Sequence, residues 1–160
     1  MSPGHAEHLK TFDYVGRHRY FLTFCTFERR TLFVTDAAVT NVRTQFLRAA
    51  DNERFAIIAY CFMPDHVHLL VEGQSHDSDA CRFIARAKQL SAFHYEKAFG
   101  ELLWQRYSYE RVLRSEEATL SVARYILENP VRAGLVTRTA DYAFLGSHTY
   151  SVDHILGGYR

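Results

Sequence analysis

Residues 54–72 read RFAIIAYCFMPDHVHLLVE and contain two apolar runs on either side of a Pro-Asp pair. Apolar runs of this length, rich in β-branched and aromatic residues, are typical of buried strands. Pro64-Asp65 between them is a tight-turn signal. We therefore expect a β-hairpin whose strands cover Arg54–Met63 and His66–Glu72.

The segments that flank this hairpin show the periodicities of further strands and helices. We expect, in chain order, a strand over Arg19–Arg30, a helix over Ala37–Ala50 capped by Thr35 or Asp36, a long helix over Asp79–Phe99, a strand over Trp104–Leu113 and a third helix over Ser115–Asn129. Pro130 disfavours a helical backbone for the residue before it, so the third helix should end at Asn129. The order β-α-β-β-α-β predicts the α+β class, as a ferredoxin-like split βαβ antiparallel sheet with helices on one face and an added C-terminal helix.

The composition is that of one ordinary domain. The chain has 160 residues, 48% of them apolar and 23% charged, which is enough for a single core. We expect residues 1–160 to form one domain, with residues 1–12 as a loose arm and residues 137–160 as an irregular tail. Nineteen Lys and Arg against eighteen Asp and Glu give a net charge of +1. That balance excludes a protein that coats polyanions and restricts nucleic-acid binding to local patches.

The three cysteines are widely spaced and form no CxxC pair. This pattern excludes a disulfide framework and a thiolate zinc site, and it suits a reducing compartment. No secretory signal and no continuous apolar stretch of membrane-spanning length occurs. The sequence therefore predicts a cytoplasmic protein with no membrane partner.

His66-Val67-His68 is the sharpest local motif. On a strand, residues i and i+2 point to the same face, so both imidazoles could bind one metal ion. The alternative is a pair of packing or surface histidines, which is common for an isolated His-x-His triplet. Two polar rings on an otherwise apolar strand nevertheless need partners.

Tyr125 and Asn129 form a second candidate pair. They are spaced i and i+4 near the expected end of the third helix, and therefore share a helix face. The structural alternative makes Tyr125 a core aromatic residue and Asn129 a helix-stop residue.

These two motifs together carry a resemblance to a known family. Tyr60–Glu72 (YCFMPDHVHLLVE), followed by Tyr125–Val136 (YILENPVRAGLV), resembles the single-tyrosine HUH transposases, and more closely the REP-associated tyrosine transposases of bacteria. Further blocks resemble that group in the same order: Tyr20–Phe33, Lys88-Gln89, Leu103–Tyr107 (LWQRY), Arg114 and Asp141–His148 (DYAFLGSH). The resemblance covers roughly residues 15–150.

The resemblance implies a metal-dependent endonuclease and strand transferase that acts on single-stranded DNA, often with hairpin structure. It makes His66 and His68 the metal ligands and Tyr125 the nucleophile, on the added C-terminal helix. Asn129 falls where related enzymes place a third polar ligand. Attack by the tyrosine would give a 5′-phosphotyrosine and a free 3′-hydroxyl. Two imidazoles and an amide suit a divalent ion, Mg²⁺ or Mn²⁺.

Three positions depart from the family pattern. Asp65 stands where Asn is common, and Phe144 and Gly146 stand where Trp and Ser are found in the tail block. None of these changes removes a reacting group, so they bear on fine DNA specificity. A phenol is mostly protonated at neutral pH, so Tyr125 needs a base or a cationic neighbour. Lys88 and the metal ion are both candidates.

Basic residues interleaved with aromatic ones provide candidate phosphate contacts and base-stacking surfaces. The candidates for DNA binding are Arg17, Arg19, Arg29, Arg30, Arg86, Lys88, Arg106 and Arg114. The alternative is that these side chains pair with Asp or Glu on a solvated surface.

Two further questions stay open at the level of sequence. A non-catalytic ferredoxin-like protein that binds nucleic acid, or a regulatory relative with an intact site, would share these residues. The protein is expected to be a monomer or a homodimer. The short segment Ser115–Ala118 before the third helix favours a tyrosine that serves the site of its own subunit.

Overall fold

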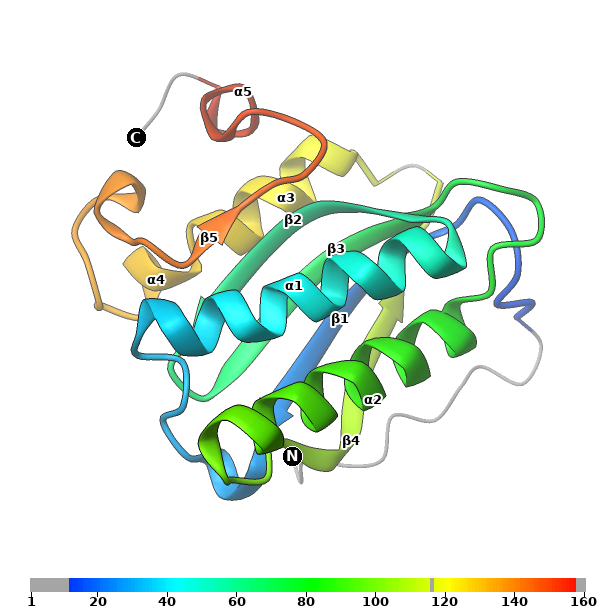
Figure 1. Ribbon diagram of the computed structural model, residues 1–160. Coiled ribbons are helices and arrows are strands. Elements are labelled where there is room, and N and C mark those ends of the chain that lie inside the picture. Colours follow the sequence, from blue (N-terminus) through cyan, green and yellow to red (C-terminus); the bar gives the residue numbers. More distant parts are fainter. Residues whose placement is uncertain (1–11, 116, 158–160) are drawn as a thin grey trace.

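A five-stranded antiparallel sheet forms the centre of the computed structural model, which describes residues 12–115 and 117–157 (Figure 1). Its strands are β1 (Arg19–Thr26), β2 (Phe55–Met63), β3 (His66–Gly73), β4 (Trp104–Val112) and β5 (Leu145–Gly146). They lie in the order β4-β1-β3-β2-β5. The expected β2–β3 hairpin is confirmed, with Met63 paired to His66 across the turn.

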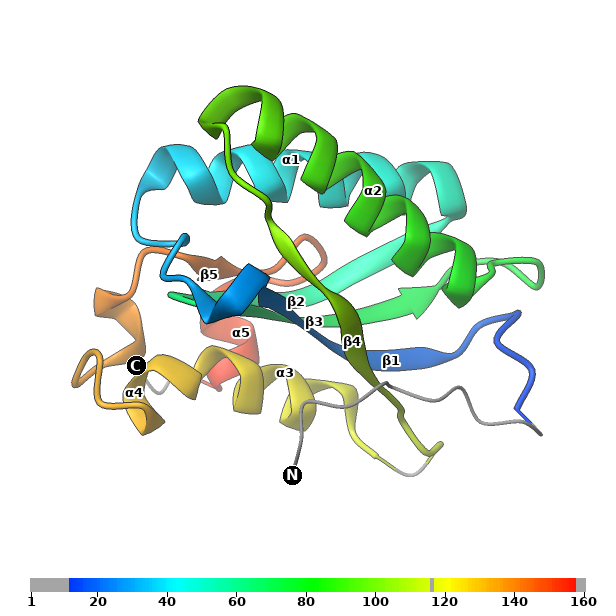
Figure 2. The same cartoon turned by 90° about the horizontal axis from the view of Figure 1, so that it is seen from below.

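Helices cover both faces of this sheet (Figure 2). One face carries α1 (Asp36–Glu53) and α2 (Ala80–Phe99), and the other carries α3 (Thr119–Leu127), α4 (Asn129–Arg132) and α5 (Val152–Leu156). The predicted split βαβ arrangement and its α+β class are confirmed, and α3 lies on the sheet face that α1 and α2 leave open. Among the described residues, no helix is both long and apolar enough to cross a membrane.

Each sheet face has its own apolar core. Side chains of β1 and β2 such as Phe24 and Phe62 pack against α1 and α2. On the opposite face, Ile58 and Leu70 pack against Ile126 of α3. Because side chains alternate along a strand, His66 and His68 share the face of Leu70. We call this α3-covered side the site face.

Two element boundaries differ from the sequence expectation. The first strand stops at Thr26 instead of Arg30, because a short 3-10 turn follows in which Glu28 and Arg29 have left-handed φ angles of 53° and 54°. The third helix covers Thr119–Leu127 instead of Ser115–Asn129. Asn129 then begins α4 with Pro130 in its first turn, where the missing N–H of proline costs nothing.

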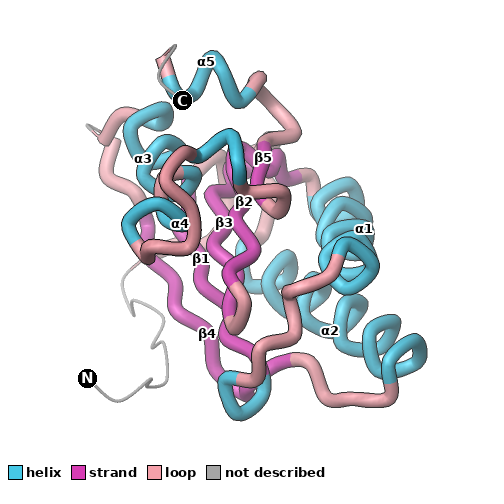
Figure 3. Tube along the Cα trace, turned by 90° about the vertical axis from the view of Figure 1, so that its left-hand side faces the viewer, coloured by secondary structure: helices cyan, strands magenta, loops and turns pink. Residues whose placement is uncertain are grey.

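The C-terminal tail is more ordered than expected. Within residues 137–157, Gly146 of β5 pairs with Tyr60 of β2, and α5 packs on the core of the site face. A Cβ on Gly146 would lie 2.7 Å from the Tyr60 Oη, so the close approach explains this glycine. Residues 1–11, which form nearly all of the expected arm, and residues 158–160 lie outside the described residues, while Phe12 packs against Tyr14. Figure 3 shows β5 at the edge of the sheet that is nearest to α1.

Candidate active site

The two histidines of β3 stand side by side on the site face. Their ring centroids are 4.7 Å apart, with the planes 76° from parallel. His66 Nδ1 lies 2.7 Å from Asp65 Oδ1, and His68 Nδ1 lies 2.8 Å from the Thr23 hydroxyl of β1. With each Nδ1 occupied by a partner, the Nε2 atoms are the ones left to bind a ligand.

Asp65 connects His66 to the turn after β1. Its second carboxylate oxygen accepts a hydrogen bond from Arg29 Nε at 3.0 Å. Partial burial alone would raise the pKa of Asp65, but the hydrogen bonds from His66 and Arg29 outweigh it and lower that pKa. Arg29, which the sequence suggests as a DNA contact, is thus tied to a carboxylate that orients a histidine.

His68 is held as a neutral imidazole. Its pKa is lowered to about 3, chiefly by burial and to a smaller extent by the nearby His66, Arg132 and Arg29. The neutral ring is the form that binds a metal ion, because one of its two nitrogen atoms keeps a lone pair.

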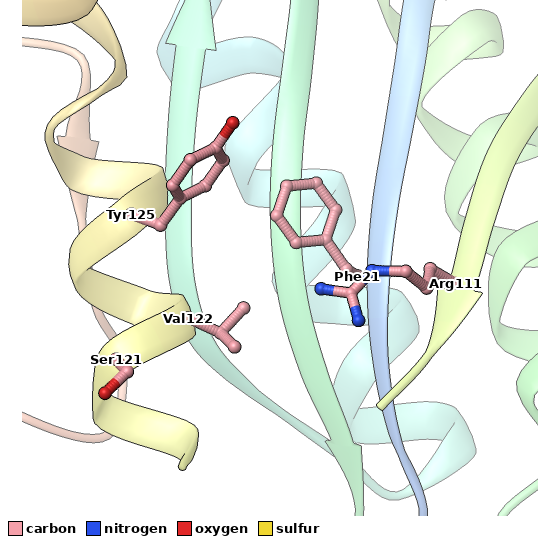
Figure 4. Close-up of a pocket in the computed structure, with 5 residues that line it drawn as sticks. All are labelled: Phe21, Arg111, Ser121, Val122 and Tyr125. Atoms are coloured by element: carbon pink, nitrogen blue, oxygen red, sulfur yellow. The ribbon is translucent and has the colours of Figure 1, made fainter. Parts of the chain in front are cut away.

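Tyr125 projects from α3 toward the same part of the sheet (Figure 4). Its side chain is 57% exposed, so the phenol is open to a large substrate. The Tyr125 ring centroid lies 6.4 Å from that of Phe21 on β1, and the Phe21 ring lies 5.4 Å from His68. One aromatic ring of the same chain therefore separates the tyrosine from the histidine pair.

Arg132 of α4 lies directly over the tyrosine. Its guanidinium carbon is 3.8 Å from the Tyr125 ring centroid. Its Nη2 donates to the Tyr125 carbonyl oxygen at 2.6 Å and to Asn129 Oδ1 at 3.5 Å. Arg132 is not among the site residues that the sequence predicts. The third helix is expected to end at Asn129, so residues beyond Pro130 are not considered as neighbours of Tyr125.

A cavity of about 460 Å³ adjoins the tyrosine on the site face. It is lined by Phe21, Arg111, Ser121, Val122 and Tyr125, whose side chains come from β1, β4 and α3 (Figure 4). The Arg111 guanidinium carbon lies 5.8 Å from the Phe21 ring centroid, and its Nη1 contacts both carboxylate oxygens of Glu117 at 2.9 and 2.8 Å. The cavity thus combines an aromatic surface with a fixed cation.

Several of the expected DNA contacts hold the protein itself together. Arg19 donates to the carbonyl oxygens of Glu117 and Arg114 and to the Thr119 hydroxyl, which fixes the segment leading into α3. Three other candidates pair with acids: Arg29 with Asp65, Arg30 with Glu28 and Glu101, and Arg86 with Glu53.

Lys88 lies on the opposite side of the sheet from Tyr125. Its ammonium donates to the carbonyl oxygens of Gln105 and Arg106 at 3.2 Å and sits 5.7 Å from the Phe24 ring centroid. Burial lowers its pKa. The expectation that Lys88 could be the cationic neighbour of the phenol is therefore wrong, because α2 packs on the face that lacks the tyrosine.

The remaining basic candidates keep their guanidinium groups near the surface. Arg17 is exposed in a polar hollow beside the start of α3. The Arg106 guanidinium carbon lies 5.2 Å from the Tyr107 ring centroid. Arg114 donates its backbone N–H to Glu117. DNA contact by these three residues stays a prediction.

The donor set fits a divalent ion that is only partly held by protein. Among the described residues, no three His, Cys, Asp or Glu side chains cluster around one point. His66 and His68 supply two imidazoles with oriented rings. The Asn129 amide oxygen lies 3.5 Å from Arg132 Nη2, and its part in a metal site stays a prediction. Two or three neutral ligands leave coordination positions open for water or a phosphate oxygen, as Mg²⁺ and Mn²⁺ sites in catalysis require.

Comparisons with known proteins agree with this architecture. The family described as "Transposase IS200 like" matches residues 14–129. A protein of Haemophilus influenzae, provisionally named a REP-associated tyrosine transposase, is 24% identical over 147 residues, covering 85% of this chain and 83% of that protein.

Two solved structures share the fold. A REP-associated tyrosine transposase bound to a REP hairpin superposes with a TM-score of 0.75 at 22% identity, over 96% of this chain and 88% of the other. A provisionally named transposase from Deinococcus radiodurans gives a TM-score of 0.52 at 25% identity, over 76% of this chain and 97% of the other.

Proposed function

The chain belongs to the IS200-like transposase family, and we propose that it is a metal-dependent endonuclease and strand transferase for single-stranded DNA. The resemblance to the REP-associated tyrosine transposases, drawn from the two motifs, is confirmed by the family match and the curated relative. The observation that carries the proposal is the placement of an exposed tyrosine on the sheet face that holds two histidines with pre-oriented rings.

The proposed reaction is a transesterification at a DNA phosphate. The Tyr125 phenolic oxygen attacks the phosphorus, and the bond from phosphorus to the 3′-oxygen breaks. The phenol loses its proton to solvent, and the leaving 3′-oxygen takes one up. The products are a 5′-phosphotyrosine and a free 3′-hydroxyl, so the energy of the phosphodiester is conserved for rejoining.

His66, His68 and Asn129 are the proposed holders of Mg²⁺ or Mn²⁺, which would neutralise a non-bridging phosphate oxygen when bound. The residues around them fix these ligands. Asp65 accepts from His66 Nδ1 and so sets the tautomer and the orientation of that ring. The Thr23 hydroxyl, which can donate or accept, fixes the orientation of the His68 ring.

The proposed substrate is a DNA hairpin or palindromic repeat with a single-stranded flank. The solved relative was bound to a REP hairpin, and the cavity beside Tyr125 offers the surfaces that single strands use. Phe21 presents a ring for base stacking, and Arg111 places a cation above it. Since Tyr125 lies on the sheet face that carries the histidines of its own chain, we propose that one subunit supplies the complete site.

The experiment uses hairpin oligonucleotides with labelled flanks, incubated with the full chain and Mn²⁺. We expect a covalent protein–DNA adduct that survives denaturing electrophoresis and disappears with a chelator. His66→Ala should abolish both cleavage and metal dependence, whereas His94→Ala on α2 should leave both intact.

The contrary result favours the non-catalytic alternative. Hairpin binding that persists in chelator, with no adduct and no cleavage of any tested hairpin, would make the protein a nucleic-acid binding module. Wild-type cleavage by His66→Ala would reject the metal site.

A further inference from the structure

Arg132 is not held by a carboxylate, unlike several other arginines of this protein. Seven described arginines pair with carboxylates, namely Arg29, Arg30, Arg54, Arg82, Arg86, Arg111 and Arg138. Within residues 12–115 and 117–157, no carboxylate forms an ion pair with Arg132. Within the described residues, the guanidinium that lies over the exposed tyrosine is therefore not held in an ion pair.

The contacts of Arg132 fix its position but leave donors unused. Its Nη2 is bonded to the Tyr125 carbonyl oxygen and approaches Asn129 Oδ1. These contacts anchor one arm of the guanidinium across the break between α3 and α4. Within the described residues, the Nε and Nη1 hydrogens make no protein hydrogen bond, and the residue is exposed.

We propose that Arg132 binds a non-bridging oxygen of the scissile phosphate and holds the Tyr125 ring in line with the phosphorus. This inference rests on the proposed function and adds a second cation to it. A guanidinium suits this role because its planar fork matches phosphate oxygens. A fixed cation beside the phosphate stabilises the charge that develops on these oxygens during attack. Its stacking on the phenol ring limits the side-chain freedom of the nucleophile.

The test compares two substrates that differ in the charge at one position. One hairpin carries an ordinary phosphodiester at the cleavage site, and the other carries a methylphosphonate, in which a neutral methyl group replaces one charged oxygen. Each separated diastereomer is used, and the rate of adduct formation is measured at saturating DNA. The proteins are the wild type, Arg132→Ala and Arg132→Lys.

We expect Arg132→Ala to form the adduct about 100-fold more slowly than the wild type on the phosphodiester, as for loss of a donor to a developing oxyanion. On at least one methylphosphonate diastereomer the two proteins should differ by less than about fivefold, because the charge that Arg132 neutralises is gone. Arg132→Lys keeps the positive charge but loses the planar, two-pronged guanidinium. On the phosphodiester, its rate of adduct formation should lie between those of the wild type and Arg132→Ala.

Arg138→Ala is the matched control. Arg138 and Arg132 both line a hollow that is separate from the cavity beside Tyr125, but Arg138 is already paired with Asp141 at 3.0 Å. The loss of Arg138 should therefore leave both rates unchanged. An Arg132→Ala defect of equal size on both substrates, with unchanged melting, would overturn the phosphate contact and leave a structural role. An absence of any adduct from the wild type on the phosphodiester would instead overturn the proposed function, and this inference with it.

Discussion

His66 Nδ1 lies 2.7 Å from Oδ1 of Asp65, the residue that immediately precedes it. The same carboxylate receives Arg29 from the left-handed turn after β1. A three-residue chain therefore runs from that turn to one of the two imidazoles. It fixes the His66 ring with its Nε2 directed away from Asp65, which is the arrangement found where a carboxylate is hydrogen-bonded to a metal-binding histidine.

Asp65→Ala should weaken Mn²⁺ binding by about 10- to 100-fold, because the His66 ring loses the partner that sets its tautomer and orientation. Asp65→Asn keeps an acceptor oxygen at this position and should cost much less. Isothermal titration of the metal-free protein with Mn²⁺ measures both. Equal affinities for the wild type and Asp65→Ala would show that the contact does not serve a metal.

Phe21→Ala should weaken binding of a hairpin with a single-stranded flank by about 1–3 kcal/mol, the value of one base–aromatic stack. The rate of adduct formation at saturating DNA should change far less. Phe93→Ala removes a ring that is 61% exposed on α2, on the other side of the sheet, and serves as the control. Fluorescence anisotropy measures the affinity, and equal losses in both variants would refute a stacking site beside Tyr125.

Substitution of Arg19 should lower the stability of the fold, whereas substitution of Arg17 should lower the affinity for DNA. Arg19→Ala removes three hydrogen bonds to the segment before α3, so we expect the free energy of unfolding to fall by about 1–3 kcal/mol. Arg17→Ala should leave the free energy of unfolding unchanged and weaken DNA binding instead. Urea unfolding measures the stability of both variants, and fluorescence anisotropy measures their affinity for DNA. A loss of stability in Arg17→Ala together with a loss of DNA affinity alone in Arg19→Ala would contradict this prediction.

The affinity for DNA should depend only modestly on salt. The net charge is +1 and many arginines are paired with acids, so few phosphates can be neutralised. We expect a plot of log K against log salt with a slope shallower than about −5, which corresponds to a handful of contacts. Anisotropy titrations across a salt series measure it. A steep slope, together with equal affinity for hairpins and unstructured strands, would contradict this prediction. The protein would then bind DNA through its overall electrostatic field and not through a few local contacts.

The sequence was sufficient for the parts of the fold that depend on local pattern. The Pro64-Asp65 turn between two apolar runs identified the central hairpin, and the spacing of apolar residues identified α1 and α2. The same alternation placed His66 and His68 on one face. These features follow from periods of 2 and 3.6 residues, which need no knowledge of the tertiary structure.

The features that depend on tertiary contacts were not accessible in that way. The sequence allows Lys88 as a cationic neighbour of the Tyr125 phenol. The packing of α2 places Lys88 on the opposite face of the sheet. Arg132 was hidden because Pro130 is read as the end of a helix, although proline is readily accepted in the first turn of the next one. The turn at Glu28 and Arg29 contains no glycine, so its composition does not predict positive φ angles.

The most direct test of the central claim is to locate the covalent bond. The full chain is incubated with Mn²⁺ and the cleavable hairpin, digested with trypsin and analysed by mass spectrometry, alongside Tyr125→Phe. We predict that the nucleotide adduct maps to Tyr125, and that Tyr125→Phe retains its fold and DNA affinity but forms no adduct. An adduct of wild-type yield in Tyr125→Phe, or one mapped to another residue, would contradict the assignment of the nucleophile.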